Sequence, residues 1–224
     1  MPVVQPELGE LARLNIRFES AGAEEILGWV ASRFGEQAVY TCSFEDAVLV
    51  DLIARTAPMI PVVLLDTQYL FAETLWFIEE IRRRYNIDVQ VAQPDVSVVP
   101  DNRWQTDTET CCHLRKVEPL ARALYGRAAW ITGVRRADGP SRATAPIVAW
   151  DPIRDLVKLN PLATWSDADV ATYTLVHELP IHPLVDKGYL SIGCWPCTRP
   201  VAPGEDRRAG RWSGLAKTEC GLHR

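Results

Sequence analysis

A regular alternation of short apolar strands and longer amphipathic helices most constrains how this chain can fold. It occupies the first half of the sequence, where apolar runs suited to buried strands are separated by segments with apolar residues at helical spacing. Such an order predicts an α/β fold, a parallel sheet with right-handed crossovers and helices packed on its faces. The predicted strands are 38–42, 62–65 and 88–92, and the predicted helices are 23–34, 45–56 and 71–85.

The second half continues the pattern less regularly. A helix is predicted over 111–126, with a kink or break at Pro119, because proline removes a helical hydrogen bond. Strands are predicted at 128–133 and 156–162. Ser166 can cap a further helix, with Asp169 as its capping-box partner. Residues 1–37 are assigned nothing beyond helices, and periodicity disappears from Leu179 onward.

Polar residues follow two of the predicted strands. Cys42 and Ser43 end the first, and Asp66 and Thr67 follow the second. Ligands of open parallel sheets bind at the carboxyl ends of the strands, so these side chains mark the expected site. Backbone amides where the next helix begins can bind an anion, with the Ser43 hydroxyl adding a donor. Taken alone, an ordinary turn with Ser43 as a helix cap is the preferred interpretation of this segment.

Composition narrows the class of protein. The chain has 224 residues, enough for one large domain, which we place at 1–200, followed by an arm at 201–224. A net charge of -5 argues against bulk nucleic-acid binding. The sequence has no apolar run long enough to span a membrane and no pattern of a secretion signal near Met1. We therefore expect a cytoplasmic protein whose thiols stay reduced.

Six cysteines in such a chain favour metal binding or reactive thiols over disulfides. Cys194 and Cys197 form a CxxC turn, whereas Cys111 and Cys112 are adjacent. Neighbouring side chains on a helix diverge by roughly 100°, so they converge poorly on one ion but can reach two irons of a larger cluster. The set favours a [4Fe–4S] cluster. A Cys₄ zinc site and buried, inert thiols remain alternatives.

Cys220 is left over, near the end of the chain. Lys217 and His223 are close in sequence, and nearby cations lower the pKa of a thiol. A thiolate on a mobile arm could close onto a bound substrate and then meet another protein. The alternative is a dispensable thiol.

Basic residues recur beside the cysteine motifs and at a strand end. Arginine matches the geometry of phosphate and sulfate oxygens, and Arg208 and Arg211 are spaced to hold one oxyanion from two sides. On an acidic chain, such clustering predicts a small, multiply charged anionic substrate, although a solvated basic surface is the usual reading of such a run. The groups are Arg115 and Lys116; Arg135, Arg136 and Arg142; and Arg207, Arg208 and Arg211.

Taken together, these segments resemble the assimilatory adenylylsulfate (APS) reductases of the iron–sulfur, thioredoxin-dependent type. The likeness runs from about residue 38 to residue 223, and the paired cysteines, the CxxC turn and the terminal ECGLH are its most specific parts. The segments that carry it are CCHLRKVEPLARAL, WITGVRRADGPSRA, KLNPLATWSDADV, HPLVDKGYLSIGCWPCT, GEDRRAGRW and KTECGLH.

The resemblance implies a PP-loop fold of the adenine-nucleotide α-hydrolase type with a flexible C-terminal arm. It implies reduction of APS to sulfite and AMP, on the route to cysteine, through an S-sulfocysteine that thioredoxin or glutaredoxin resolves. Two departures concern the nucleotide contacts: the phosphate loop is shortened to CSFED, and Gln68 replaces a glycine. The implied roles are a [4Fe–4S] cluster on Cys111, Cys112, Cys194 and Cys197; Cys220 as nucleophile; Lys116, Arg208 and Arg211 on the phosphosulfate; Arg142 and Ser43 beside them; and Asp66 in the segment lining the nucleoside pocket.

Three other functions remain to be distinguished. A reductase for the 3′-phosphorylated substrate PAPS is one, although members of that type usually lack the four cysteines. A PP-loop enzyme that thiolates tRNA or adenylates its substrate is another, but it would need ATP and a fuller loop. The third is a zinc-stabilised binding module. The sequence leaves a homo-oligomer open.

Overall fold

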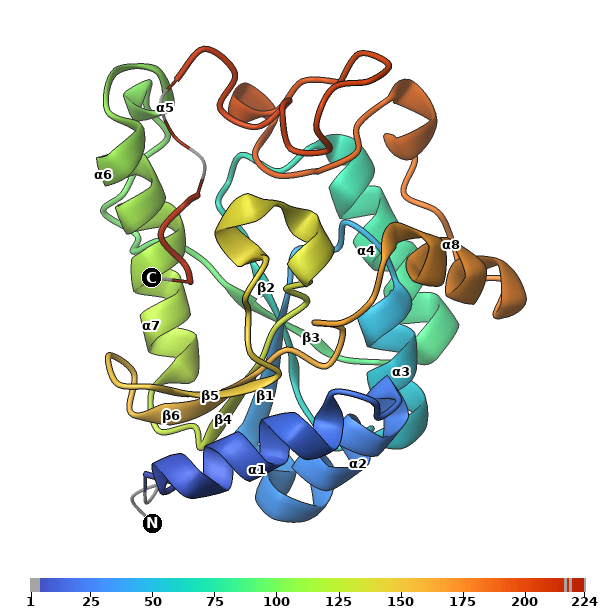
Figure 1. The fold of residues 1–224 in the computed structure, drawn as a ribbon. Coiled ribbons are helices and arrows are strands. Elements are labelled where there is room, and N and C mark those ends of the chain that lie inside the picture. Colours follow the sequence, from blue (N-terminus) through green and yellow to red (C-terminus); the bar gives the residue numbers. More distant parts are fainter. Residues whose placement is uncertain (1–4, 216, 218, 224) are drawn as a thin grey trace.

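The computed structural model, described here for residues 5–215, 217 and 219–223, is built around one six-stranded sheet. The strand order is β3-β2-β1-β4-β6-β5, and every neighbouring pair is parallel except β5 and β6 (Figure 1). The predicted parallel α/β sheet is therefore confirmed. The strands are β1 (Ala38–Cys42), β2 (Val62–Leu65), β3 (Val89–Ala92), β4 (Ala129–Ile131), β5 (Val148–Asp151) and β6 (Leu156–Leu159).

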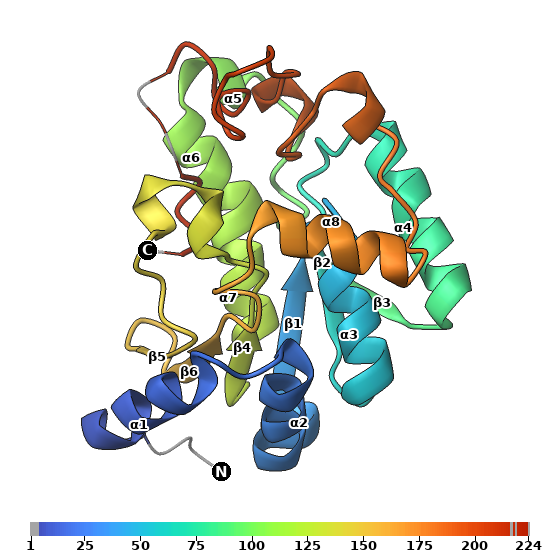
Figure 2. The same ribbon diagram turned by 45° about the vertical axis from the view of Figure 1, so that its right-hand side comes forward.

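Helices cover both faces of the sheet, as Figures 1 and 2 show from two directions. Their bounds follow the predicted periodicity closely in the first half of the chain. Ser166 and Asp169 form the predicted capping box at the start of α8. The helices are α1 (Leu8–Phe18), α2 (Ala23–Phe34), α3 (Val48–Thr56), α4 (Ala72–Tyr85), α5 (Arg103–Thr106), α6 (Thr108–Cys112), α7 (Glu118–Leu124) and α8 (Asp167–Val176). Among the described residues, no helix has the length and apolar character needed to cross a membrane.

The alternation of side chains along β1 divides the core into two parts. Tyr40 and Cys42 belong to the larger cluster, which includes buried residues of α2, α3 and α4. Val39 faces the other way and packs with Leu120 and Leu124 of α7. Successive strand residues point to opposite faces, so a strand covered on both sides needs apolar residues throughout. This is why AVYTC carries almost no exposed residue.

One strand was not predicted. β5 pairs with β6 in the antiparallel direction and forms an edge of the sheet. The side chain of Asn15 in α1 covers part of this edge. Its Oδ1 accepts from the backbone amides of Ile147 and Val148 at 2.9 and 3.1 Å, and its Nδ2 donates to Val148 O at 2.7 Å. Such a strand depends on these long-range partners, which local periodicity cannot reveal.

The predicted helix over 111–126 is continuous but changes its winding. Residues His113–Val117 form a π-helical turn between α6 and α7. Pro119 follows at the start of α7, where the preceding turn can do without its missing amide. The irregularity thus lies just before the proline. π-Turns inside helices often occur at functional sites, and this one carries Arg115 and Lys116.

The chain changes direction between two central strands. From β1 it proceeds to β2 and β3 on one side, and it then returns to add β4 on the other side. This topological switch opens a crevice at the carboxyl ends of β1 and β4. The Thr132 hydroxyl, just after β4, hydrogen bonds to Asn160 Oδ1, and Asn160 Nδ2 donates to Pro146 O at 2.7 Å. These bonds tie three segments together at that edge.

Replacing Asn160 with alanine should therefore destabilise the fold. The change removes the partners of buried polar groups on Thr132 and Pro146, a loss of about 2 kcal/mol in the free energy of unfolding. Urea unfolding measures it. Asn102→Ala is the matched control, because Asn102 is exposed and its side chain makes no cap hydrogen bond. Equal stability of the two variants would contradict this account.

Candidate active site

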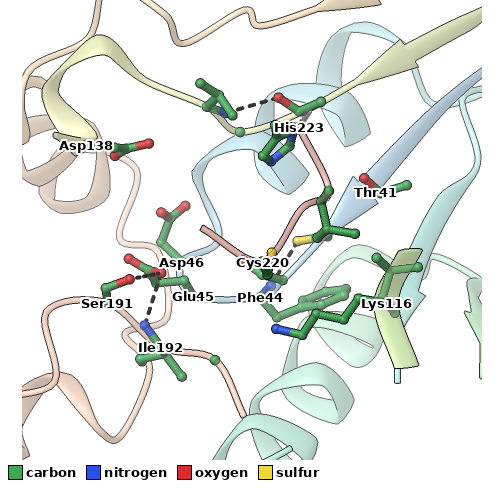
Figure 3. A pocket seen from close by; sticks show the side chains of 18 of the residues that line it. Thr41, Phe44, Glu45, Asp46, Lys116, Asp138, Ser191, Ile192, Cys220 and His223 are labelled. Carbon is green, nitrogen blue, oxygen red and sulfur yellow. Dashed lines mark hydrogen bonds between the residues drawn. The ribbon is translucent and has the colours of Figure 1, made fainter. Parts of the chain in front are cut away.

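A cavity of about 200 Å³ lies at the carboxyl edge of the sheet, where β1 and β4 diverge. Its floor comes from the residues that follow β1, β2 and β4, and its far wall comes from 191–194 and the C-terminal segment. Figure 3 shows Cys220 near the middle of the labelled side chains, with Lys116 pointing into the same space. Elements far apart in the sequence therefore meet at the edge where the strand pattern predicted a ligand site.

Most of the predicted substrate-binding residues line this cavity together. They come from the loop after β1, the π-helical turn, the loop after β4 and the C-terminal segment. Cys194, one of the four predicted ligand cysteines, lines it too. The predicted residues that it brings together are Ser43, Lys116, Arg142, Arg208, Arg211 and Cys220.

Among the predicted substrate-binding residues, Asp66 does not line the cavity. Its carboxylate accepts from the amide of Gln68 at 2.8 Å and from Gln93 Nε2 at 2.9 Å. Gln68 stands where the resembling family has glycine, and its φ of 64° lies in the left-handed region. Arg115 Nη1 donates to Gln68 Oε1 at 2.6 Å. A role for Asp66 in nucleoside binding therefore stays a prediction.

Ser43 does not act as the cap of α3. The helix begins after Ala47, which makes no side-chain cap bond, and Asp46 Oδ1 accepts from the amide of Val48 at 2.9 Å. Ser43 is exposed at the cavity instead. The short turn thus leaves the Ser43 hydroxyl available to a ligand, as the anion-binding interpretation of this segment requires.

Lys116 links the cavity to the cysteine cluster. Burial opposes a charge on its amino group, but the sulfurs of Cys194, Cys220 and Cys112 outweigh that effect and raise the pKa of Lys116. The side chain is therefore a cation at neutral pH, held between Cys220 and the predicted ligands. It is positioned to stabilise negative charge that develops in the cavity.

The guanidinium of Arg211 lies flat against the backbone of the opposite wall. Its Nη1 donates to Ile192 O at 3.2 Å, and its carbon atom lies 4.7 Å from the centre of the Trp212 ring. Gly193 makes this approach possible, because a β-carbon there would overlap the guanidinium. The glycine therefore sets the position of one predicted anion-binding arginine.

Carboxylates balance part of the positive charge around the cavity. Glu45 accepts from Arg207 at 2.6 Å and from the amide of Ile192 at 3.1 Å (Figure 3 draws the second bond). Glu219 is held by Arg142, whose Nε and Nη2 donate at 2.9 and 3.0 Å. Burial would raise the pKa of Glu219, but the hydrogen bond and charge of Arg142 lower it, so the carboxylate is ionised.

Two arginine donors on the cavity wall remain without a partner in the part of the chain that the structure describes. These are Nη1 of Arg135 and Nε of Arg211, both buried. Arg135 is only 5% exposed and binds Asp167 and Asp138 through its other terminal nitrogen. Buried polar groups normally have hydrogen-bond partners, so these donors indicate a bound anion or ordered water.

The four predicted ligand cysteines lie close together beside the cavity. Cys111 and Cys194 pack on one side, Cys112 packs beside Cys220 on the other, and Cys197 contacts both groups. Burial, and after it the other three predicted ligands, raise the pKa of Cys111 to about 11. The same two causes, burial first, raise the pKa of Cys197 to about 11. A positive metal centre would stabilise the thiolate forms of such clustered cysteines.

The four thiols surround a common cavity with Arg115 and Lys116 on its wall. Within residues 5–215, 217 and 219–223, no three cysteine, histidine or acidic side chains are arranged to hold a single metal ion. A cubane cluster needs one thiolate on each iron and does not require the four sulfurs to converge on one point. The four cysteines therefore offer the number and kind of ligand that a [4Fe–4S] cluster needs.

The C-terminal arm is folded back into the cavity. Cys220 is buried, and Leu222 packs on the cluster formed by α7, β1 and β4. The ring of His223 stacks on Trp130 with centroids 5.3 Å apart and planes at 14°. Burial and the nearby charge of Lys158 hold the pKa of His223 well below its usual range, so its ring is neutral. The expectation from the sequence that His223 is a cation near Cys220 is therefore wrong.

Lys217 is the second cation expected near Cys220. Its amino group forms an ion pair with Glu109 at 2.7 Å.

Cys42 is set apart from the other cysteines. The Tyr40 hydroxyl and the amide of Phe44 both donate to its sulfur, at 3.1 and 3.2 Å. Burial raises the pKa of Cys42 to about 12 in spite of these bonds. Although it lines the cavity, this thiol is protonated and a poor nucleophile at neutral pH.

A comparison with known proteins is consistent with this geometry. The profile of the phosphoadenosine phosphosulfate reductase domain matches residues 37–200, well over half of the chain. This chain belongs to the phosphoadenosine phosphosulfate reductase family. Its relatives include the adenosine 5′-phosphosulfate reductases of Mycolicibacterium smegmatis, 44% identical over 97% of this chain and 95% of the relative, and of Streptomyces coelicolor, 45% identical over the same shares.

Two solved structures have folds similar to that of this chain. A phosphoadenylyl-sulfate reductase from Candida auris, in a phosphate complex, matches with a TM-score of 0.78 and 26% identity, over 88% of this chain and 99% of that one. An FMN adenylyltransferase from Candida glabrata matches at a TM-score of 0.60 and 17% identity, over 88% and 67%. The second likeness concerns the fold alone.

Several residues of this family member's site had no clear signal in the sequence. Glu219 stands directly before Cys220, and Gly193 directly before Cys194, so both were within the segments considered but had no assigned role. Trp130, which supports the arm, reads as an ordinary strand residue. Their roles depend on which segments meet, and only the folded chain reveals that.

Replacing Gly193 with alanine should displace the Arg211 guanidinium without unfolding the protein. The added methyl group meets the far end of a flexible side chain, so the arginine moves and the backbone stays. Affinity for sulfate should fall by about tenfold, the effect of losing one charge-assisted hydrogen-bond donor group. Isothermal calorimetry with sulfate measures it, and urea unfolding checks the fold.

The matched control is Gly28→Ala in α2, where a β-carbon meets nothing within 4 Å. It should leave sulfate affinity unchanged. Unaltered affinity in the Gly193 variant as well would show that this glycine does not position Arg211.

Proposed function

We propose that this protein is an adenylylsulfate reductase of assimilatory sulfate reduction, which converts APS to sulfite and AMP. The proposal draws on relatives at 44% and 45% identity that are named adenosine 5′-phosphosulfate reductases. The single observation in the structure that carries it is the meeting of the Cys220 thiol with Lys116, Arg142, Arg208 and Arg211 in one cavity. A nucleophile among cations suits attack on a doubly charged mixed anhydride of sulfate and phosphate.

In the first step the Cys220 thiolate attacks the sulfate sulfur of bound APS. A sulfur–sulfur bond forms, the bond from that sulfur to the bridging oxygen breaks, and AMP leaves with the electron pair. Lys116, Arg208 and Arg211 hold the oxygens of the phosphosulfate and stabilise the charge on the leaving phosphate. Arg142 and Ser43 bind beside them. The unpaired donors on Arg135 and Arg211 support such an anion in this position.

In the second step a thiolate of a reduced dithiol protein attacks the sulfur of Cys220. Sulfite leaves with its electron pair, and a mixed disulfide forms. The second thiol of the donor then releases Cys220 and becomes part of the donor's own disulfide, so the two electrons gained by sulfite come from the dithiol. A thioredoxin or glutaredoxin fits this role. The four clustered cysteines and the poorly nucleophilic Cys42 leave no resolving thiol of the chain itself.

We assign the four clustered cysteines to a [4Fe–4S] cluster. Cys111, Cys112, Cys194 and Cys197 would each supply one thiolate, with Arg115 and Lys116 as neighbouring cations. When bound, the cluster supplies charge and rigidity beside Lys116, and no electron of the reaction passes through it. The alternative is a Cys₄ zinc ion, whose usual ligand spacing of C-x₂₋₄-C in both halves is absent from the adjacent pair Cys111 and Cys112.

The division of the chain follows from this chemistry. Residues 1–200 form the catalytic domain, and residues 201–224 form an arm that carries the nucleophile. The arm must close over APS in the first step and expose the S-sulfocysteine in the second. The four cysteines favour APS over PAPS, and a comparison of sulfite release from the two nucleotides separates them.

Replacing Cys220 with serine should abolish sulfite release, because a hydroxyl cannot form the thiosulfonate bond. Wild-type protein exposed to APS without a thiol donor should carry a sulfonate adduct on the peptide that contains Cys220, found by mass spectrometry. The visible absorbance should be the same in both proteins, which separates a lost nucleophile from a lost cluster. Continued turnover by the variant would refute the assignment of Cys220.

Anaerobically purified protein should be brown and contain about four iron and four sulfide ions per chain. Chelation of the metal should remove the colour and lower the thermal unfolding midpoint, because a buried cluster contributes to folding free energy. Cys111→Ser should reduce the iron content, whereas Cys42→Ser should not. A colourless preparation containing zinc would overturn the cluster assignment and leave the nucleophile test intact.

A further inference from the structure

Glu219 directly precedes Cys220 in the chain. Its carboxylate forms ion pairs with Arg142 and Arg208, two of the arginines that line the cavity. Its two oxygens accept from Nε and Nη2 of Arg142 at 2.9 and 3.0 Å. Arg208 Nη2 lies 3.5 Å away and Ser141 Oγ lies 3.2 Å away. The side chain of Glu219 is only 18% exposed. This is a partly desolvated ion pair, a stronger interaction than a pair on the open surface.

Two of these partners are residues assigned to the anionic substrate. The planar fork of arginine binds a carboxylate through the same parallel donors that it offers to phosphate or sulfate. Arg142 and Arg208 therefore cannot bind Glu219 and a substrate oxyanion at full strength with the same donors. Glu219 has the charge and geometry of an internal substitute for that oxyanion.

The arm has a second attachment that does not involve these arginines. Arg154 Nη2 donates to Leu222 O at 3.0 Å, and His223 stacks on Trp130. Loss of the Glu219 contacts would therefore loosen the segment around Cys220 while the residues beyond it stay attached. The exchange of one anion for another can be local.

We propose that Glu219 is a positioning residue that docks the arm on the anion site of the substrate-free enzyme and that the substrate's oxyanion displaces it. The docked state keeps Cys220 buried beside Cys112 and Cys197 and among the cations of the cavity. Arrival of the oxyanion takes over Arg142 and Arg208, and the arm is then free to adjust Cys220 to the sulfur that it attacks. The identity of that oxyanion rests on the proposed function, but the competition itself does not.

Glu219→Gln tests the competition directly in the holoenzyme without substrate. The neutral amide binds the arginines more weakly, so affinity for inorganic sulfate should rise by about tenfold, the usual effect of removing one charge-assisted pair. Isothermal calorimetry measures this. A structural lesion in the arm would lower anion affinity or leave it unchanged, so a rise distinguishes competition from damage.

Alkylation of Cys220 by iodoacetamide is the second readout, followed by mass spectrometry of the C-terminal peptide. The variant should react about tenfold faster than the wild type if the arm is released. Removing a negative charge beside a thiol also increases its thiolate fraction, which shifts the midpoint of the pH profile. Release instead raises the limiting rate at high pH. The pH profile therefore separates access from thiol acidity.

Glu205→Gln is the matched control. Glu205 lies in the same arm and accepts from Arg199 at 2.9 and 3.1 Å, but it does not line the cavity. Its replacement should change neither sulfate affinity nor the alkylation rate. Neither readout uses sulfite formation, so they stand even if APS is not the substrate. Unchanged or weaker sulfate binding in Glu219→Gln, or an unchanged limiting alkylation rate, would overturn the proposal.

Discussion

The structure depends most on how a concentration of positive charge is accommodated at the carboxyl edge of the sheet. Several arginines and Lys116 converge on a partly desolvated space, where like charges repel each other more strongly than in water. Glu45, Asp138 and Glu219 neutralise some of them through short ion pairs. The unpaired donors of Arg135 and Arg211 reflect the positive charge that these carboxylates leave unneutralised.

The sheet topology explains why this charge can be gathered without disturbing the core. The apolar residues of β1, β2 and β4 are buried on both faces, so their ends hold a rigid edge on which loops can vary. The π-helical turn then places Arg115 and Lys116 between the thiols and the cavity. The C-terminal segment closes the opposite side with Gly193 and Arg211. The residues that form the core and the residues that form the site are therefore different parts of the sequence.

Local sequence patterns predicted the frame better than the site. The bounds of β1, β2 and α2 follow directly from apolar periodicity, because each element buries a continuous face. β5 was missed, since it is defined by β6 and by Asn15 rather than by its own pattern. The grouping of Cys220 with most of the basic residues in one cavity was predictable from residue type and from resemblance, whereas their roles stay predictions. Glu219 and Gly193 were not, because their roles arise from partners distant in the chain.

The burial of Trp212 sets a limit on where the nucleophile can be delivered. This residue is 3% exposed and packed beside Cys112, so it acts as a fixed tether point, and Cys220 follows eight residues later. A fully extended segment of that length spans at most about 28 Å. In the proposed reaction, the thiol of the donor protein would therefore have to come within this distance of Trp212, so the length of one short segment limits the part of the surface where the donor can dock.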